Sequence, residues 1–393
     1  MYKCSILADS VGLQGDRIIT YKVTYPRIIH AEMCRHRILS RNSASSRAIP
    51  FKKMVKMVKE DPFIPIAWQK DHPGMQGTEY LSKTDTFNLN SFITALVNTL
   101  YFERDSKKYY ALKNEIDEKV ILIENLLQDY KDFTKTLDDW WLLARDKAVE
   151  AASILHVFRT TKQLCNRLLE PFLWHTEIIT GTEYDNFFEL RCPRYKHTYL
   201  EGMISKSKED LKCALSIYAG LNRDMGADDE AGNLDTSKLL TNDSQAEIHI
   251  QAIAEMMWDA YNQSNPKQLQ AGEWHIPFGD RFDWDSIRKV YSLENQPINL
   301  DIKIATSRCA RISYETLGDN PKIDYEADVK LHDMLLESKH MSPFEHCAQV
   351  MSDLEYRNFT KTSPYPDVNG YTEQEGWCRN FKGFIQYRHL VEQ

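Results

Sequence analysis

Apolar and polar side chains alternate along residues 18–25, where every second residue is apolar. This period of two predicts a half-buried β-strand. Pro26 follows, at a position that the first turn of a helix tolerates, and the apolar spacing after it predicts a helix running to about Ile38. Residues 40–47 are rich in serine and other small polar residues, which are unfavourable inside a helix.

Longer stretches have helical periodicity. Residues 112–130 carry an apolar stripe and lie within a helical insertion that we expect over residues 81–139. A second pattern runs from about residue 141 to residue 169 and stops before Pro171, because proline cannot continue a helix. We expect residues 205–240 to form a second insertion of helix and loop.

Two more helices are expected in the second half of the chain. Ser244 and Glu247 have the spacing of a capping box, which predicts a helix start before an apolar face that ends at Tyr261. A short helix is expected through Leu331 and Leu335. The sequence shows no tandem repeat of the kind that builds solenoids.

The composition is typical of a soluble globular protein, with 42% hydrophobic and 27% charged residues in a chain of 393. There is no run of 18 apolar residues, so we expect no membrane span, and the first six residues lack the apolar core of a signal peptide. The eight cysteines show no CxxC spacing, which predicts reduced thiols in a cytoplasm and no metal site. The net charge of −8 argues against a general nucleic-acid binder.

One stretch has the opposite charge balance. Residues 33–59 contain neither Asp nor Glu. They contain eight basic residues: Arg35, Arg37, Arg41, Arg47, Lys52, Lys53, Lys56 and Lys59. Such a stretch is either the site of an anionic ligand or a solvated basic face, and charge alone does not decide between the two.

The triplet Arg35-His36-Arg37 is followed, after seven residues, by Ser45 and then by Arg47. Guanidinium groups match phosphate oxygens bidentately, and serine hydroxyls with free backbone N–H groups complete an anion-binding turn. Successive residues on a helix point about 100° apart, so the triplet cannot face a single ligand. It suits two ligands on different sides, for example a nucleotide phosphate and a cofactor.

This pattern resembles the signature of the flavin-dependent thymidylate synthases, written Arg-His-Arg, seven residues, Ser. Residues 176–191 resemble the family segment that ends in its nucleotide-activating arginine. Residues 305–313 resemble the segment that opens the usual family chain, and residues 340–346 resemble the family's His-x-[Ser/Thr]-Pro-Phe-Glu-His motif. The last two precede the signature in the usual family chain and follow it here. The chain therefore resembles a circularly permuted member, of a phage and bacterial branch, and permutation is tolerated where chain ends lie close together. Residues 385–389 echo the family's approach to the signature.

The resemblance implies a reaction and its cofactors. Reduced FAD would pass a one-carbon unit from methylenetetrahydrofolate to C5 of dUMP and then give a hydride, and NADPH would reduce the flavin. The product would be dTMP, and the enzyme a cytoplasmic methyltransferase of nucleotide biosynthesis that needs no protein nucleophile. The resemblance also implies an α+β fold, with a twisted antiparallel sheet packed against long helices in one domain over residues 1–393, and a homotetramer with FAD at the subunit interfaces.

Site residues follow from their positions in the motifs. The nucleotide phosphate would be held by Arg35, Ser45, Arg47 and Arg167. Arg191 would lie against the pyrimidine and favour its N3-deprotonated form, because a fixed cation lowers the cost of that anion. FAD would be contacted by Arg35, His36, Arg37, Asn186, Ser342 and Glu345, with Ser313 as a further contact. His340 would lie near the flavin ring and the folate.

Simpler interpretations of some of these residues stay open. Arg167 lies late in a helical stretch, where a cation can cap carbonyl groups, and His340 and Glu345 suit local capping of a helix end. The apolar stripe at residues 112–130 suits packing, including packing against another subunit.

The chain departs from the family pattern at three positions. Glu32 stands where the family commonly has Gln, Ser43 where it has Glu, and Ala48 where it has Tyr. A carboxylate only accepts hydrogen bonds, so Glu32 at a base edge would favour the amino group of cytosine. Two alternatives therefore stay open. One is methylation or hydroxymethylation of dCMP or dUMP with the same flavin machinery, and the other is a nucleotide-binding or scaffold protein without turnover.

Overall fold

The computed structural model describes residues 1–70, 79–82, 107–110, 113–114, 116–118, 135–196, 203–221, 241–291, 299–314, 324–362 and 373–392. The chain divides into two compact units, Ile64–Ala151 and the remainder, Met1–Phe63 with Ala152–Gln393. The described residues form a mixture of helices and sheets, in agreement with an α+β fold. None of the helices in these ranges is both long and apolar enough to cross a membrane.

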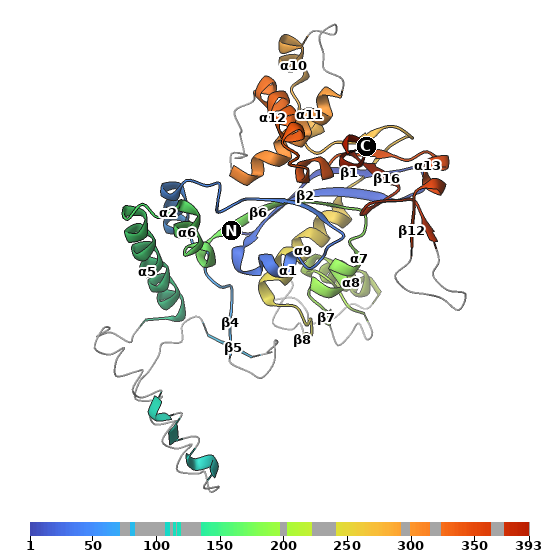
Figure 1. The fold of residues 1–393 in the computed structure, drawn as a ribbon. Helices are drawn as coiled ribbons and strands as arrows, with labels where there is room; N and C mark the ends of the chain where they lie inside the picture. The colour runs from blue at the N-terminus through green and yellow to red at the C-terminus, as the bar shows by residue number, and fades with distance from the viewer. Residues whose placement is uncertain are drawn as a thin grey trace. The chain divides into compact units, whose positions relative to one another are not determined.

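A five-stranded sheet forms the centre of the larger unit (Figure 1). Its strands run in the order β3 (Ser40–Ser43), β6 (Trp174–Gly181), β2 (Arg17–Pro26), β1 (Lys3–Val11) and β9 (Lys267–Gln268). All neighbouring strands are antiparallel except β1 and β9. Strand β2 contains residues 18–25, so the predicted strand is confirmed. Its first half is buried on both faces, because Ile18 and Thr20 are as inaccessible as the apolar residues between and after them.

Helix α9 (Ile248–Gln263) packs on strands β1 and β2. Its residues Ile250 and Met257 are fully buried in a core that these strands share, as expected for an amphipathic helix. The helix predicted after Ser244 is therefore present, but it begins later. Glu247 is the N-cap, and its carboxylate accepts hydrogen bonds from the first backbone N–H groups of the helix.

The C-terminal part of the chain adds further helices and a smaller sheet. Helices α11 (Leu300–Arg311) and α12 (Tyr325–Glu337) pack on each other, and α12 is the helix predicted through Leu331 and Leu335. A three-stranded antiparallel sheet has the order β10 (Trp274–His275), β11 (Ala348–Val350) and β16 (Phe384–Gln386). Leu7 of β1, Ile178 of β6 and Ile304 of α11 belong to one buried core, so distant parts of the sequence are folded together.

Two predicted helices end earlier than expected. After Pro26 the chain forms a 3-10 turn, η1 (Arg27–Ile29), and α1 (His30–Met33), so the prediction of a helix to about Ile38 is wrong. The pattern over residues 141–169 is divided between α5 (Leu137–Val157) and α6 (Lys162–Arg167), followed by η2 (Glu170–Phe172). Arg159, between α5 and α6, has a φ of 61°, a left-handed conformation that a continuous helix excludes.

The smaller unit contains a hairpin of β4 (Trp68–Gln69) and β5 (Tyr80–Leu81) and the first part of α5. Trp68 donates from Nε1 to Asp138 at 2.7 Å within this unit. Most of the insertion predicted over 81–139, with its apolar stripe, lies outside the described residues. The second predicted insertion begins with α8 (Lys208–Leu221), and residues 222–240 also lie outside them.

The other described elements are α2 (Phe51–Glu60), α7 (Asp185–Arg191), β7 (Tyr195–Lys196), β8 (Thr241–Asn242), η4 (Gly279–Arg281), α10 (Trp284–Val290), η5 (Ile312–Tyr314), η6 (Ser342–Glu345), α13 (Asp353–Asn358), β12 (Thr360–Thr362), β13 (Glu373–Glu375), β14 (Trp377–Cys378), β15 (Phe381–Lys382) and α14 (Tyr387–Val391).

Candidate functional site

The Arg35-His36-Arg37 triplet lies in a series of tight turns directly after α1. The backbone N–H groups of the three residues bond to carbonyls only two or three residues earlier, at 3.0 to 3.4 Å. His36 is buried, whereas Arg35 and Arg37 are exposed. The triplet therefore diverges, as expected, but it diverges because of turn geometry and not because it continues a helix.

The imidazole of His36 contacts a distant segment of the chain. Arg191, the last residue of α7, donates from Nε to Nε2 of His36 at 3.0 Å. Burial, with Arg191 and Arg41 adding to it, lowers the pKa of His36 to about 4, so the ring is neutral near neutral pH. Because Nε2 accepts this hydrogen bond, the ring proton resides on Nδ1. The ring also meets Phe187 edge-on, with 5.0 Å between centroids.

Glu32 adds a negative charge beside the two arginines. Burial, reinforced by Glu247, raises the pKa of Glu32, while Arg191 and Arg35 oppose that change. Burial likewise lowers the pKa of Arg191, and the charge of Glu32 counteracts it. We refer to Glu32, Arg35, His36 and Arg191 as the charged cluster. The structure thus brings together four residues that were predicted to bind ligands.

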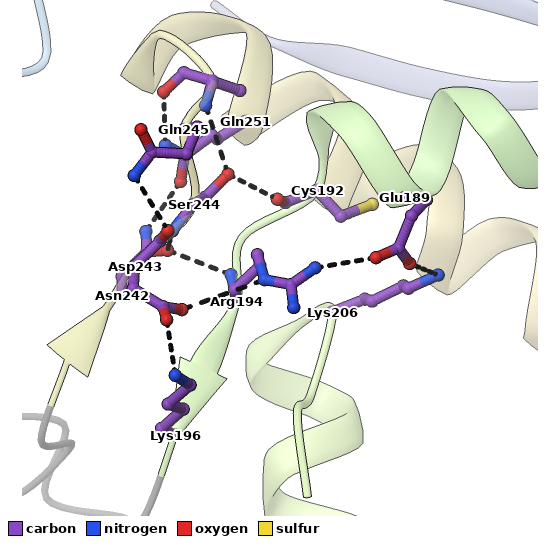
Figure 2. A network of polar contacts seen from close by, with 11 residues as sticks. Glu189, Cys192, Arg194, Lys196, Lys206, Asn242, Asp243, Ser244, Gln245 and Gln251 are labelled. Carbon is purple, nitrogen blue, oxygen red and sulfur yellow. Dashed lines mark hydrogen bonds and ion pairs between the residues drawn. The ribbon is translucent and has the colours of Figure 1, made fainter. Parts of the chain in front are cut away.

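Polar contacts hold the end of α7, which carries Arg191, beside the start of α9 (Figure 2). The side-chain oxygen of Asn242 accepts from the backbone N–H of Arg194 at 2.9 Å, and its Nδ2 donates to Gln251 of α9 at 2.6 Å. Further contacts are Ser244 Oγ to the Cys192 carbonyl at 2.8 Å, Arg194 to Glu189 at 2.7 Å, Lys206 to Glu189 at 3.0 Å and Lys196 to Asp243 at 2.5 Å. Of this positioning network, only Ser244 was singled out in the sequence, as a helix cap, and its hydroxyl instead bonds to the carbonyl of Cys192. The other residues share no motif.

The serine-rich segment is held as an extended edge of the central sheet. Strand β3 pairs with β6, and Ala44 continues the pairing with an N–H bond to the carbonyl of Thr176 at 2.8 Å. The backbone N–H of Ser45 then bonds to the carbonyl of Ser313 at 3.1 Å. Two predicted site residues therefore meet through their backbones. Arg47 is exposed, and within the described ranges it makes no ion pair or hydrogen bond.

Arg41 has a different role from the other basic residues of this stretch. It donates to Glu177 Oε2 at 3.2 Å, and Tyr25 donates to the same oxygen at 2.6 Å. Glu177 is almost completely buried, and burial raises its pKa even though Arg41 opposes the change. In the register of the sheet, Ser43 and Val23 lie opposite Glu177, so its two partners approach diagonally from the strands on either side. Arg41 thus compensates a buried carboxylate and is not available to a ligand.

Arg167, at the end of α6, lies apart from the contacts of the charged cluster. It lines a cavity of about 370 Å³ together with Arg27, His30 and Glu170. Arg27 faces Glu170 at 3.7 Å, whereas Arg167 is exposed and has no such partner among the described residues. This cavity therefore offers a second group of cations close to the start of α1.

The 340–346 motif forms the turn η6, which packs on β3 and α11. His340 is exposed and shares a hydrogen bond with Ser338 Oγ at 2.8 Å. Glu345 accepts from Arg388 at 2.6 Å. Ser342 and Asn186 are exposed, and no described residue bonds to their side chains. The motif thus reaches the serine-rich strand, but no described side-chain contact joins His340 to the charged cluster.

The side-chain amide of Gln386, in the C-terminal segment, is buried against β3, the strand that follows the Arg35-His36-Arg37 triplet. Gln386 donates from Nε2 to Ser40 Oγ at 3.2 Å and to Asn380 Oδ1 at 2.9 Å. Asn380 in turn donates to the carbonyl of Ile38 at 2.8 Å. Residues 385–389, which echo the approach to the signature, therefore contact the segment that follows it.

In the described ranges, no group of three or more His, Cys, Asp or Glu residues is arranged to hold a metal ion. No protein-family model matches the chain, and no curated protein matches it. Two solved structures of the UMP/dUMP methylase PolB from Streptomyces cacaoi, bound with 5-Br UMP and with 5-Br dUMP, are similar to it at 12% sequence identity. The alignment with the structure bound with 5-Br UMP covers 56% of this chain and 90% of the PolB chain, with a TM-score of 0.27. The alignment with the structure bound with 5-Br dUMP covers 52% of this chain and 67% of the PolB chain, with a TM-score of 0.23.

Proposed function

We propose that this chain transfers a one-carbon unit from methylenetetrahydrofolate to C5 of dUMP in a flavin-dependent reaction that yields dTMP. The observation that carries the proposal is the 3.0 Å contact between Arg191 and His36. It joins the two segments that resemble the nucleotide-activating and signature motifs of the flavin-dependent thymidylate synthases. The contact is specific, because it depends on a neutral imidazole and one guanidinium nitrogen.

Arg191 would activate the base electrostatically. Its Nε is engaged by His36, and its terminal guanidinium nitrogens have no hydrogen bond to any described residue, so they remain for the pyrimidine edge. A cation held there lowers the cost of deprotonating N3 and raises the electron density at C5. Because His36 is neutral, it orients Arg191 without adding a second positive charge at the base.

The nucleotide phosphate would be bound by Arg35, Ser45, Arg47 and Arg167. The exposed side chains of Arg47 and Arg167 have no ion pair with a described carboxylate, and such guanidiniums can contact a phosphate bidentately. In the homotetramer that we propose, Arg167 of a neighbouring copy would complete the set, since within one chain no described contact links it to the charged cluster. Light scattering of the purified protein tests that assembly directly.

The proposed FAD-binding residues are Arg35, His36, Arg37, Asn186, Ser342, Glu345 and Ser313, and their chemistry fits this anionic dinucleotide. The side chain of Arg37 is exposed and makes no ion pair or hydrogen bond with the described residues, so its charge is open to a pyrophosphate. Asn186 and Ser342 offer exposed polar groups. His36 and Glu345 are engaged by Arg191 and Arg388, so they would act by orienting those arginines. When bound, FAD supplies the redox chemistry, with NADPH as the source of electrons.

The test is a single anaerobic experiment on the purified protein. The flavin is reduced with NADPH, dUMP and methylenetetrahydrofolate are added, and nucleotide products are identified by mass. The proposal predicts a product one methylene unit heavier than dUMP, together with reoxidation of the flavin. A protein that binds nucleotide but stays colourless after addition of FAD would show instead that the chain is a binding or scaffold protein.

A second substrate is favoured by one observation. Glu32 lies within the charged cluster beside Arg191, and its carboxylate can only accept hydrogen bonds when ionised. This chemistry matches the exocyclic amino group of cytosine. The same experiment with dCMP decides between the bases, and the product mass separates a methyl group from a hydroxymethyl group.

A further inference from the structure

A second cavity lies beside strand β1, and its lining also includes residues of β9, β10, η4, α10 and α11. Its volume is about 480 Å³, within the range of small-molecule sites. Three aromatic rings line it, those of Trp274, Phe282 and Trp284, together with the carboxylates of Asp280 and Asp301. None of these residues belongs to the charged cluster or to the motifs that led to the proposed function.

The carboxylates that line this cavity differ in their ion pairs with the described residues. A third lining carboxylate, Asp9, is fully engaged by Arg17, with contacts of 2.9 and 2.6 Å. Asp280 faces only Arg281, at 3.9 Å on the surface, and Asp301 has no basic partner among the described residues. Among the described residues of the lining, Lys267 is the basic one. Among the described lining residues, Asp301 is therefore the carboxylate without an ion pair, and it shares the cavity with the aromatic rings.

The aromatic rings are suited to a positive charge. The guanidinium of Arg308 already lies over the ring of Phe282, 5.0 Å from its centroid, so the protein itself uses this ring for a cation–π contact. Trp284 is 39% exposed and no described cation lies over its ring, which leaves indole surface for a ligand. Cation–π attraction is strongest for tryptophan.

A buried chain of hydrogen bonds ends at the wall of the cavity. It runs from Ser10, which lines the cavity, through His275, Thr20 and Thr180 to His346, with every contact between 2.8 and 2.9 Å. The Nε2 atom of His346 is buried and has no partner among the described residues.

The unpartnered Nε2 atom of His346 determines which group donates in each hydrogen bond of this series. A buried donor without a partner is rarer than a buried acceptor without one, so the proton of His346 belongs on Nδ1. Each hydroxyl then donates to the next, and His275 donates from Nδ1 to Ser10. The hydroxyl hydrogen of Ser10 is consequently available to an acceptor in the cavity.

We propose that this cavity binds a small organic cation, with its ammonium group between Asp301 and Trp284 and a hydrogen-bond acceptor at Ser10. The inference goes beyond the proposed function and does not depend on it. Choline is a suitable probe, because it combines a quaternary ammonium with one hydroxyl group. Its neutral isostere, 3,3-dimethylbutan-1-ol, has the same shape without the charge.

The test is calorimetric titration of the full-length protein with each probe. Choline should bind saturably with a Kd on the order of millimolar or lower, at least about tenfold more tightly than the neutral isostere. Asp301→Asn and, separately, Trp284→Leu should each weaken choline binding at least about fivefold. Asp285→Asn is the matched control, because Asp285 is an exposed carboxylate of α10 that does not line the cavity.

Three outcomes would overturn the proposal: no saturable choline binding, equal binding of choline and its isostere, or binding unaffected in both variants. Should Asp301→Asn fail to fold, Trp284→Leu decides alone, because Trp284 is 39% exposed and lies outside the buried cores. The activity of the charged cluster is measured separately, so failure here leaves the proposed function untouched.

Discussion

Arg191 and His36 are 155 positions apart in sequence, yet Nε of the first lies 3.0 Å from Nε2 of the second. The acceptor is neutral and buried, and the donor carries its charge at the end of a short helix. One side of the guanidinium is therefore fixed by the protein, and the other side is free to meet a ligand.

Replacing Arg191 by Lys should preserve the positive charge but remove the fork that bonds His36 and the base together. We expect the rate of one-carbon transfer to fall by about 10²- to 10³-fold, the usual cost of losing a preorganised donor. Stopped-flow measurement of flavin reoxidation checks this. Arg288→Lys is the control, since the ion pair that the described residues give Arg288 is with Asp285 on the surface of α10. Equal rates in the two variants would contradict an activating role.

Replacing Glu32 by Gln changes what the base edge meets, because an amide both donates and accepts. We expect the preference for dUMP over dCMP to rise by about tenfold or more, because the amide of Gln can donate to a carbonyl of uracil, which the carboxylate of Glu32 cannot do. The ratio of kcat/KM for the two nucleotides measures it, with Glu60→Gln on the exposed face of α2 as the control. An unchanged ratio would place Glu32 away from the base.

Arg47→Gln should weaken nucleotide binding without affecting the fold, because Arg47 is exposed and bonds to no described residue. A charged hydrogen bond to phosphate contributes about 1.5–3 kcal/mol, so the KM for dUMP should rise roughly ten- to hundredfold. Lys59→Gln, an exposed cation of α2, should leave it unchanged. If deoxyuridine without phosphate is affected as strongly as dUMP, Arg47 does not bind the phosphate.

Buried histidines should make the protein sensitive to acid. Burial, with His275 adding to it, lowers the pKa of His346 to about 3 from the usual 6.5. Between these values the unfolded chain binds more protons than the folded one, so this part of the stability is complete above 6.5 and is lost as the pH falls. The expected loss is roughly 1.4 kcal/mol for each pH unit.

Urea unfolding at about pH 7 and about pH 5 measures this loss. His346→Asn keeps an amide for the hydrogen bond with Thr180 but does not titrate, so its stability should depend less on pH. His340→Asn, at an exposed position nearby in sequence, should behave as the unaltered protein does. A steeper dependence in His346→Asn would be incompatible with a buried neutral imidazole.

Gly376 should tolerate no side chain. Its φ of 83° lies in the left-handed region, and an added Cβ would overlap the ring of Tyr356. Gly15 has the same φ but open space around it, so Gly15→Ala isolates the backbone cost of about 1 kcal/mol. Gly376→Ala should destabilise by that amount plus a further 1–3 kcal/mol of overpacking, measured by thermal unfolding. Equal losses in the two variants would mean that Tyr356 moves aside freely.

The sequence predicts part of this structure well and part of it poorly, for physical reasons. The strand over residues 18–25 was predictable because its alternation reflects a local period. Arg41 was not separable from its basic neighbours, because its role depends on the register that sets β3 beside β6 and places Glu177 within reach. The early end of α1 follows from turn contacts rather than from any helix-breaking residue before Ile38.

The candidate site shows the same division. Motif resemblance selected Arg35, His36 and Arg191, but the contact between the last two depends on the packing of α7 and could not be deduced from their spacing. Ser45 and Ser313 likewise meet through backbone atoms, and a contact between backbone atoms cannot be predicted from the identity of the two residues.

The hydrogen bond between Gln386 and Ser40 spans 346 positions of the chain. Ribosomes add residues from the N-terminus at only about 5–20 per second, so the strand after the signature waits many seconds for its partner. During that interval the nascent chain exposes a serine-rich edge that the mature protein covers. The contact between Gln386 and Ser40 therefore forms long after the strand itself is synthesised, and a chaperone that shields that edge would raise the yield of folded protein.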